Sequence, residues 1–434
     1  MLVTITIITI FIFPFDSFRE WSNHNHWLNN PQKALPNWII LFSDNLFPHT
    51  TLDFTKDAIL LNNNISGINT ISHSYDINLD HSIYPQNFQI LYIVKNDSNI
   101  YLDINITRPD GKVFTIYSKQ PSLSQTVTKN EFSGRILSND EEIFNQLQNY
   151  DEDFTYKHNL SSFAMIFSDI NKNHFLKGKY TLNLSFYIFE KAEIIQSQII
   201  LGGDTYGFLG TDKAGRDIAL GILWATPFTL FVGFMVSTVS VLIGLIYGTI
   251  AGYKGGKIDG FLMRISDIIY CLPSLPLLII LTYSVKDRDI ILIAFFLIIF
   301  GWINIAKVIR SITLKIKNSY YIEASKLIGQ SDHKIIVKHI IPQLIPLVFA
   351  NIAIAFPGAI IAESSLSFLG LGDPSIPTWG QILHDAYNRG ALYEGLWWWI
   401  LPPGIMIGLT GLIFMMIGNA IESLDPRIGI NKIT

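Results

Sequence analysis

The chain has 434 residues, of which 49% are hydrophobic and 15% are charged, and its mean hydropathy is +0.32. This composition is too apolar for an ordinary soluble domain, and a net charge of −4 argues against a nucleic-acid-binding protein. Residues 219–420 hold nearly all the long uncharged runs, whereas residues 16–205 are polar and rich in Asn, Asp and Ser. The composition therefore predicts a membrane domain with one large soluble insertion.

The first apolar run, Leu2 to Phe15, is shorter than a complete membrane span. Its 14 residues would make a helix of about 21 Å, whereas the hydrocarbon layer is ~30 Å thick. A secretory signal peptide is a weak alternative, because the run lacks a basic start and a small-residue cleavage site. We expect residues 1–15 to be the outer end of a first transmembrane helix that begins upstream of Met1.

Residues 16–205 have the pattern of a mainly β domain. Apolar and polar residues alternate over 180–188 and 102–106, which is typical of half-buried strands. The Arg-Pro-Asp-Gly sequence at 108–111 predicts a hairpin turn into the next strand. The polar tract 121–157, with its acidic run at 151–153, is expected to be loop or short helix. The whole segment is expected to form an antiparallel sandwich without a catalytic site.

Five later apolar runs are long enough to cross a membrane: 223–251, 268–285, 289–308, 343–366 and 396–419. The second contains Pro273 and Pro276, so we expect a kinked helix there. With the N-terminal helix, these runs predict six transmembrane helices, five of them in a membrane domain over 206–427.

Basic residues in the short loops predict the orientation of these helices. Residues 307–340 carry seven lysines and arginines against two acidic residues, so this segment is expected in the cytoplasm. The 253–267 loop adds three basic residues on the same side. The 16–205 segment has 14 basic and 21 acidic residues, a net charge of −7, and lies one crossing away. We therefore expect it to be external, with both termini cytoplasmic.

A polar helical stretch at 319–342 separates two apolar runs. Gly329 can supply the left-handed residue that ends a first helix, and Ser331 or Asp332 can cap a second one. The second helix, near 333–340, has an apolar face, and Pro342 either stops it or opens the next span. A loop that only sets topology would not need a hinge, a cap and an apolar face together. The stretch therefore predicts an amphipathic hairpin that binds a partner groove.

Several stretches resemble a known family. Glu323-Ala324-Ser325, followed by Gly329 and by His339-Ile340-Ile341-Pro342, is similar to the EAA loop of bacterial ABC importer permeases, although Ser325 replaces the commoner Ala. The sequence GQSDHKIIVKHIIP is similar to the version in the dipeptide, oligopeptide and nickel permeases. Two further stretches resemble the same subfamily: LGTDKAGRD (209–217), before the first complete span, and AGYKGGKIDGFLMRISDIIYCLP (251–273), in the following cytoplasmic turn. ESSLSFLGLGDPSIPTWG (363–380) and LDPR (424–427) resemble the C-terminal region of its C-type subunit. The resemblance covers about 205–427 and leaves 16–200 outside the family pattern.

The resemblance implies the transmembrane permease subunit of a binding-protein-dependent importer, which forms half of a path for di- or oligopeptides. The implied partners are a second permease subunit, two ATP-binding subunits, an external peptide-binding protein, the peptide and the lipid bilayer. The EAA loop would be the coupling helix that contacts an ATPase. The residues assigned to this coupling are Glu323, Ala324, Ser325, Gly329, Asp332, His333, His339 and Pro342.

This chain is not expected to be an enzyme or to bind a cofactor or metal. It has no G-x-x-x-x-G-K-[ST] phosphate loop, so ATP must be bound by partner subunits. At the external mouth, Glu363 is expected to be a solvated helix end, a gate or a docking contact. Arg216 and Asp217 could form a local interfacial pair, and Asp212 could cap a helix.

Two alternatives remain open. The same scaffold could import nickel chelates, antimicrobial peptides or peptide-nucleotide antibiotics. A membrane-anchored external receptor or enzyme that uses the β domain is a different class, and it would require an active constellation that the sequence does not display.

Overall fold

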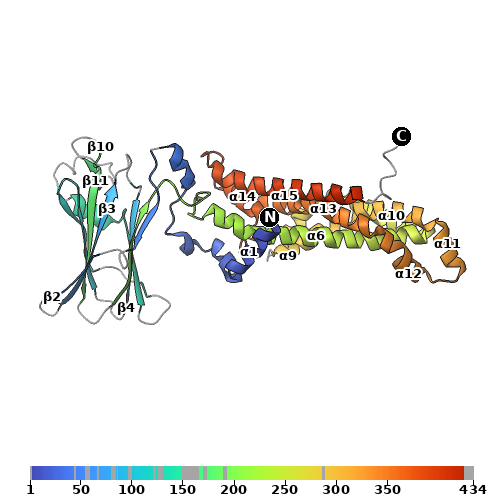
Figure 1. The fold of residues 1–434 in the computed structure, drawn as a ribbon, viewed down its shortest axis with the longest axis horizontal. Helices are drawn as coiled ribbons and strands as arrows, with labels where there is room; N and C mark the ends of the chain where they lie inside the picture. The colour runs from blue at the N-terminus through green and yellow to red at the C-terminus, as the bar shows by residue number, and fades with distance from the viewer. Residues whose placement is uncertain are drawn as a thin grey trace. The chain divides into compact units, whose positions relative to one another are not determined.

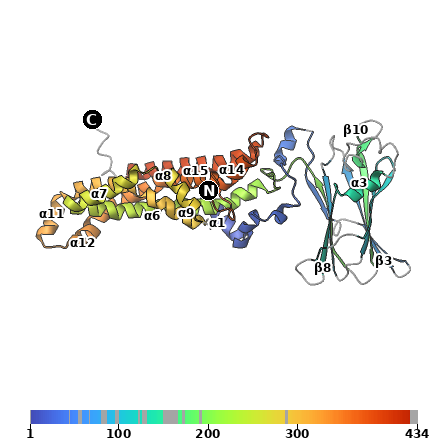
Figure 2. The same cartoon turned by 180° about the vertical axis from the view of Figure 1, so that it is seen from behind.

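The computed structural model describes residues 2–43, 45–53, 59–65, 68–79, 85, 87–95, 100–120, 124–125, 131–148, 166–169, 174–188, 193–285 and 289–424. The chain forms two compact units, Met1–His24 with Ile218–Thr434, and Asn25–Asp217. Figures 1 and 2 show that the first is built from helices and the second from strands, so we call them the helical unit and the β unit.

The β unit contains two antiparallel sheets whose described strands number five each. The first has the order β1 (Thr50–Asp53), β12 (Glu193–Gly202), β4 (Asn87–Lys95), β8 (Glu131–Leu137) and β7 (Ser124–Gln125). The second has the order β2 (Ile59–Ile65), β3 (Ile68–Leu79), β11 (Gly178–Ile188), β5 (Ile100–Thr107) and β6 (Val113–Lys119). Buried side chains from both sheets form one hydrophobic core, so the unit is a β-sandwich (Figure 1). The unit also contains the short pair β9 (Ser168–Asp169) and β10 (His174–Phe175), helix α3 (Glu141–Gln148) and the 3-10 helix η3 (Asn37–Phe42).

The alternating patterns in the sequence correspond to strands of this sandwich. The pattern over 180–188 is β11 and that over 102–106 is β5, and the two pair with Leu184 opposite Ile104. The predicted turn closes the β5–β6 hairpin, where the amide of Gly111 donates to the carbonyl of Arg108 over 2.9 Å. Alternation sufficed here because one side of each strand faces the core and the other does not.

The described part of the tract 121–157 contains the expected short helix, α3, but also strands that were not expected. It contains β7, β8 and α3, and β8 pairs in antiparallel register with β4. Gly134 interrupts the apolar alternation of β8. The ring of Tyr92 on the neighbouring strand β4 fills the space that a side chain at residue 134 would take. That cross-strand packing cannot be read from β8 alone. The acidic run at 151–153 lies outside the described residues.

One polar contact links the two sheets through the core. His73 on β3 is buried, and its Nδ1 lies 2.8 Å from Oγ of Ser197 on β12. Burial lowers the pKa of His73 below its ordinary value of 6.5, because the charged imidazolium would lose its hydration. The native sandwich therefore favours the neutral ring.

Acidification should destabilise the sandwich through His73. Below pH 6.5 the unfolded chain binds a proton that the native ring resists, so this contribution is full above pH 6.5 and is lost as the pH falls toward the native pKa. We expect hydrogen exchange of β3 and β12, corrected for the intrinsic effect of pH, to report weaker protection at pH 5 than at pH 7.5. A His73→Leu variant should show a shallower pH dependence, and an unchanged slope would contradict the assignment.

The helical unit follows the apolar runs of the sequence. Its elements are α1 (Leu2–Ile12), η1 (Phe15–Trp21), α6 (Ile218–Lys254), α7 (Gly256–Cys271), α8 (Ser274–Ser284), α9 (Ile290–Gly301), α10 (Ile303–Lys317), α11 (Tyr320–Leu327), α12 (Asp332–Ile335), the π-helical turn η4 (Ile336–Ile340), α13 (Ile341–Phe368), α14 (Trp379–Asn388) and α15 (Trp397–Leu424). The short 3-10 helix η2 (His24–Trp27) lies where the chain passes from this unit to the β unit.

Three described helices are long and apolar enough to cross a membrane, and the number rises to five if two bent helix pairs each count as one span. The first pair, α7 with α8, bends by 80°, and the second, α9 with α10, bends by 40°. The kink expected in 268–285 is thus a complete break. Leu272 has extended backbone angles (φ −74°, ψ 135°), because a residue that precedes a proline is sterically disfavoured in the helix.

Three glycines bring α6 close to α10. A Cβ on Gly248 would collide with the backbone oxygen of Ala306, and one on Gly252 would lie 2.9 Å from the backbone oxygen of Arg310. Gly244 lies one turn earlier on the same face and is equally confined. Small residues at intervals of four let membrane helices approach through their backbones, so this stripe sets the α6–α10 contact.

Candidate functional site

The 319–342 segment forms a helix, a left-handed turn and a second helix. Gly329 has φ +84°, a left-handed conformation that glycine adopts without steric cost. The amide of Gly329 donates to the carbonyl of Lys326 over 2.9 Å, and the amide of Gln330 donates to the carbonyl of Ser325 over 3.2 Å. This pair of bonds is a Schellman helix end. The predicted hinge is therefore present at the predicted residue.

Asp332 fastens this turn to the end of α6. Its carboxylate accepts a hydrogen bond from the Tyr253 hydroxyl (2.9 Å) and pairs with Nζ of Lys254 (2.6 Å). Ser331 occupies the N-cap position of α12, but its side chain makes no capping hydrogen bond. The expected side-chain cap is therefore wrong. The Asp332 side chain instead connects the hairpin to a helix about 80 positions earlier in the chain.

Pro342 opens the next span and does not stop the helix before it. The helix continues from Asp332 to Phe368 through the π-helical turn η4. A proline lacks an amide hydrogen and crowds the carbonyl four residues earlier, and a wider π turn accommodates both effects. Within this turn, Nε2 of His339 lies 3.0 Å from Oε1 of Gln330, across the hairpin.

The apolar face predicted for the second helix points into the hairpin. Of the two residues that mark this face, Ile340 is fully buried and Ile336 is half-buried, and both pack in one cluster with Ile335, Ile322 of α11 and Tyr253. The expectation that this face is offered to a partner is therefore wrong. Two other apolar side chains are offered to the surroundings, Leu327 at 88% exposure and Ile328 at 81%. They precede Gly329 directly, and the reversal of the chain there turns them away from the hairpin core.

The remaining predicted coupling residues lie around this tip. Glu323, Ala324 and His333 are exposed on the two helices. Ser325 is buried and donates from Oγ to the carbonyl of Tyr321 over 2.8 Å, which explains why a small residue stands there. The structure thus gathers the predicted residues in one hairpin, with its polar residues outside and Ser325 inside.

Glu363 lies near the end of α13 but is not a solvated helix end, because it is 1% exposed. Its carboxyl group accepts hydrogen bonds from the hydroxyls of Ser367 (2.7 Å) and Ser364 (3.3 Å). Thr378, the N-cap of α14, also hydrogen-bonds this carboxyl. The interpretation of Glu363 as a solvated helix end is therefore wrong, because its side chain is buried and hydrogen-bonded within the chain. Within the chain, Glu363 joins the last turn of α13 to the start of α14.

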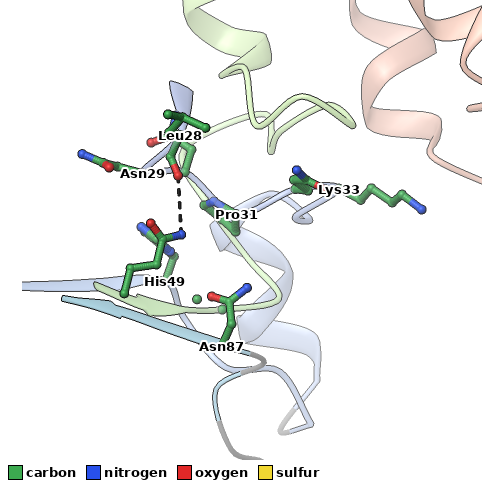
Figure 3. A pocket seen from close by; sticks show the side chains of 11 residues that line it. Leu28, Asn29, Pro31, Lys33, His49 and Asn87 are labelled. Carbon is green, nitrogen blue, oxygen red and sulfur yellow. Dashed lines mark hydrogen bonds between the residues drawn. The ribbon is translucent and has the colours of Figure 1, made fainter. Parts of the chain in front are cut away.

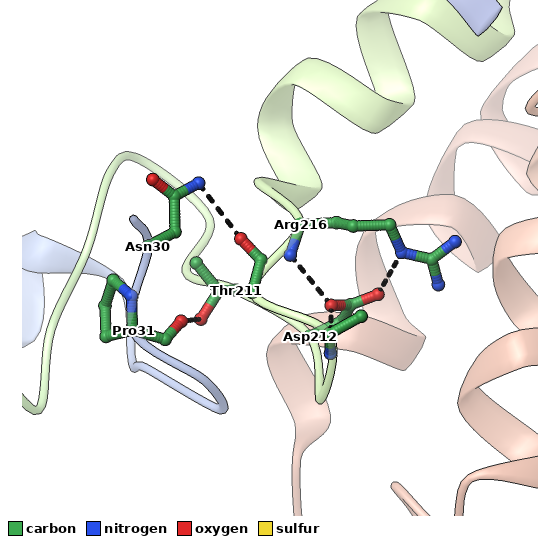
Figure 4. A network of polar contacts seen from close by, with 7 residues as sticks. Asn30, Pro31, Thr211, Asp212 and Arg216 are labelled. Carbon is green, nitrogen blue, oxygen red and sulfur yellow. Dashed lines mark hydrogen bonds and ion pairs between the residues drawn. The ribbon is translucent and has the colours of Figure 1, made fainter. Parts of the chain in front are cut away.

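A polar clasp closes the segments through which the chain enters and leaves the β unit (Figure 4). Arg216 pairs with Asp212 through Nε and Oδ2 at 2.5 Å, and Oδ1 of Asp212 accepts from the backbone amides of Ala214 and Arg216. The expected helix cap at Asp212 is therefore wrong, because its carboxylate is bound within its own loop and α6 begins only at Ile218. Asp212 stabilises a tight loop, and Asp217 contributes a strand-like backbone bridge with Thr211.

The clasp also ties together segments that are about 180 residues apart. The Thr211 hydroxyl donates to the carbonyl of Pro31 (2.6 Å), and Nδ2 of Asn30 donates to the carbonyl of Gly215 (3.0 Å) (Figure 4). The incoming and outgoing chains of the β unit are therefore joined to one another. We call the bonded segments 30–37 and 204–216 the neck.

A polar cavity of about 410 Å³ lies in the β unit beside the neck (Figure 3). The buried Nδ1 of His49 and Oε1 of Gln89 have no hydrogen-bond partner among the described residues. Burial lowers the pKa of His49 to about 4, so the ring is neutral at pH 7. The cavity therefore has a mainly uncharged polar lining, in which Lys33 is the charged exception. Its lining comprises Leu28, Asn29, Asn30, Pro31, Gln32, Lys33, His49, Asn87, Gln89, Gly202 and Gly203.

Long apolar helices with polar turns between them place the chain in the class of helical multi-pass membrane proteins. The chain belongs to the family described as binding-protein-dependent transport system inner membrane component, and the model of this family matches residues 240–429. The match contains the whole 319–342 hairpin and Glu363.

Known relatives align with about half of this chain. The dipeptide transport system permease protein DppC of Bacillus subtilis is 37% identical over 51% of this chain and 69% of its own length. The oligopeptide transport system permease protein OppC of the same organism is 33% identical, with 51% and 72% covered. OppC of Haemophilus influenzae is 36% identical, with 51% and 71% covered. The chain is therefore an inner-membrane, multi-pass permease component of a transport system.

Proposed function

We propose that this chain is the C-type permease subunit of an ABC importer and forms half of a translocation path for di- or oligopeptides. The support is the sustained similarity to permease proteins named for dipeptide and oligopeptide transport, which covers more than two thirds of each relative. A second permease subunit would complete the path, and an external peptide-binding protein would deliver the peptide.

The 319–342 hairpin would couple this path to a cytoplasmic ATPase subunit. The observation that carries this assignment is the exposure of Leu327 and Ile328 beside a turn that Asp332 fastens to the end of α6. Two exposed apolar side chains suit a groove on a partner, and the bonds of Asp332 would transmit displacement of the turn to a membrane helix. Glu323, Ala324, His333 and His339 would complete the contact from the flanks of the hairpin.

The proposed topology has six transmembrane helices, with α1 as part of the first and both termini in the cytoplasm. Residues 16–205 would then be external, and Asp212, Arg216, Asp217 and Glu363 would lie toward the external mouth. The supporting argument is the distribution of basic residues, which concentrates in 253–267 and 307–340.

Transport by the reconstituted complex tests the substrate. The chain would be purified with its second permease subunit, the ATPase subunits and the binding protein, and reconstituted into liposomes. We expect ATP-dependent uptake of labelled di- and oligopeptides. Uptake of nickel chelates, antimicrobial peptides or peptide-nucleotide antibiotics without uptake of simple peptides would contradict the peptide assignment and leave the permease assignment intact.

Thiol labelling tests the topology. In a Cys271→Ser background, which removes the single cysteine of the chain, Asn139→Cys and Lys334→Cys place thiols on exposed positions of the β unit and the hairpin. We expect an impermeant maleimide to label residue 139 in intact cells, after permeabilisation of the outer membrane where there is one. Residue 334 should be labelled only after lysis. Labelling in the opposite order would reverse the proposed orientation.

A further inference from the structure

The β unit displays a compact group of exposed apolar side chains. Trp38, Leu41, Phe42 and Phe208 are 40%, 82%, 80% and 73% exposed. We call these four residues the neck patch. Soluble surfaces rarely gather several large apolar side chains in one place, so a patch of this kind indicates a contact with an apolar partner.

The neck patch is held in place by bonds between its two segments. Nε1 of Trp38 donates to the carbonyl of Phe208 over 3.1 Å, and the amide of Asn37 donates to the carbonyl of Gly207 over 2.9 Å. The rings of Trp38 and Phe42 meet edge to face at 6.5 Å. Three of the four side chains are therefore presented from the 3-10 helix η3, and Phe208 is presented from a segment that is hydrogen-bonded to this helix.

The neck patch lies at the end of the β unit where the chain enters and leaves this unit. Phe208 lies in the neck, and the η3 residues of the patch follow the neck directly. In the neck, the amide of Leu35 donates to the carbonyl of Asp204 (2.7 Å) and the amide of Tyr206 donates to the carbonyl of Leu35 (2.8 Å). Ten residues after Phe208, the chain begins the 37-residue apolar helix α6. Ten residues reach at most about 35 Å even when fully extended, so the patch is tethered close to a membrane span.

The composition of the patch suits lipid. Residues 34–42 and 205–211 contain no charged side chain. A binding surface for a protein normally surrounds its apolar centre with a polar rim, whereas a surface that enters the lipid headgroup region combines aliphatic and phenylalanine tips with tryptophan. Trp38 fits that role, because its ring nitrogen already has a hydrogen-bond acceptor.

We propose that the neck patch inserts into the interface between headgroups and acyl chains of the bilayer that the helical unit spans. The β unit would then be anchored to the membrane by the patch in addition to its two chain connections, and this anchor would restrict its tilt over the membrane surface. The inference is independent of the transported substrate and of which side of the membrane carries the β unit.

Spin-label accessibility tests the proposal on the full chain in nanodiscs of phosphatidylethanolamine and phosphatidylglycerol. In the Cys271→Ser background, nitroxides are attached at Phe42→Cys and, as the control, at Asn139→Cys, an exposed turn residue of the same unit. Oxygen concentrates in lipid, whereas a hydrophilic nickel chelate concentrates in water. The measured quantity is the ratio of oxygen accessibility to nickel-chelate accessibility at each label. We expect this ratio to be at least several-fold higher at 42 than at 139.

Two results would overturn the proposal. A label at 42 that behaves like the label at 139 would place the patch in water. Low accessibility to both relaxants at 42 would mean that protein covers the patch. Leu41→Cys provides a second position, so that a local defect at 42 is distinguished from a patch outside the bilayer: lipid accessibility at 41 supports the proposal, and water accessibility at both positions rejects it.

Discussion

Replacing Gly329 with valine should strongly reduce transport by the assembled importer while the protein still inserts into the membrane. The left-handed backbone at this residue, with φ +84°, costs an L-residue about 1–2 kcal/mol, and a β-branched side chain tolerates it poorly. A Cβ at this position would meet no atom within 4 Å, so the effect would come from the backbone and not from a collision. If the native hairpin conformation is disfavoured by this free energy, its population falls about five- to thirty-fold, and we expect coupled uptake to fall by the same factor.

A Gly329→Asn variant provides the matched control. Asparagine enters the left-handed region more readily than other non-glycine residues, so this variant should keep most of the uptake at equal membrane levels. The measurement is ATP-driven peptide uptake together with peptide-stimulated ATPase activity. Equal uptake by the valine and asparagine variants would show that the left-handed turn is not needed for coupling.

Replacing Leu327 and Ile328 together with serine should detach the ATPase subunit. Both side chains are more than four-fifths exposed in the chain itself, so serine there should leave the folded permease unchanged. If both side chains are buried by the partner, their removal would cost about 3 kcal/mol or more, which weakens association by at least about 100-fold. Copurification of the ATPase subunit with the tagged permease, and stimulated ATPase activity, would both report the loss.

The control for this variant keeps the apolar character of the tip. A Leu327→Met, Ile328→Leu variant preserves most of the apolar area and should retain the ATPase subunit. Thermal stability of the purified permease should be the same for both variants. Retention of the ATPase subunit by the serine variant would place the coupling contact elsewhere, for example on the polar flank at Glu323 or His333.

The sequence predicted features whose cause is local. Strands β5 and β11 follow from alternation, because one face of each strand meets the core. The long helices α6, α13 and α15 follow from uninterrupted apolar runs. The turn at Gly329 follows from the conformational freedom that only glycine has in full.

Choices between equivalent partners were decided by the tertiary structure. Arg216 could reach Asp217 or Asp212, and the loop of the neck places its guanidinium on Asp212. Asp332 could have capped its own helix, but Tyr253 and Lys254 lie beside it and bind both carboxylate oxygens. The hydrogen-bonding capacity of these side chains was evident from residue type, whereas their partners depend on which segments meet.

The burial or exposure of apolar side chains was also decided by the tertiary structure and not by the sequence. Composition alone marks the hairpin and the neck as partly apolar. The fold buries Ile335 and Ile340 against α11, exposes Leu327 and Ile328 at the tip, and brings Trp38 beside Phe208 from 170 residues away. Sequence by itself therefore determined the long apolar helices, the strands β5 and β11 and the turn at Gly329, because each depends on short-range periodicity or backbone freedom. Which surfaces remain available for a partner or for lipid was decided only by long-range packing.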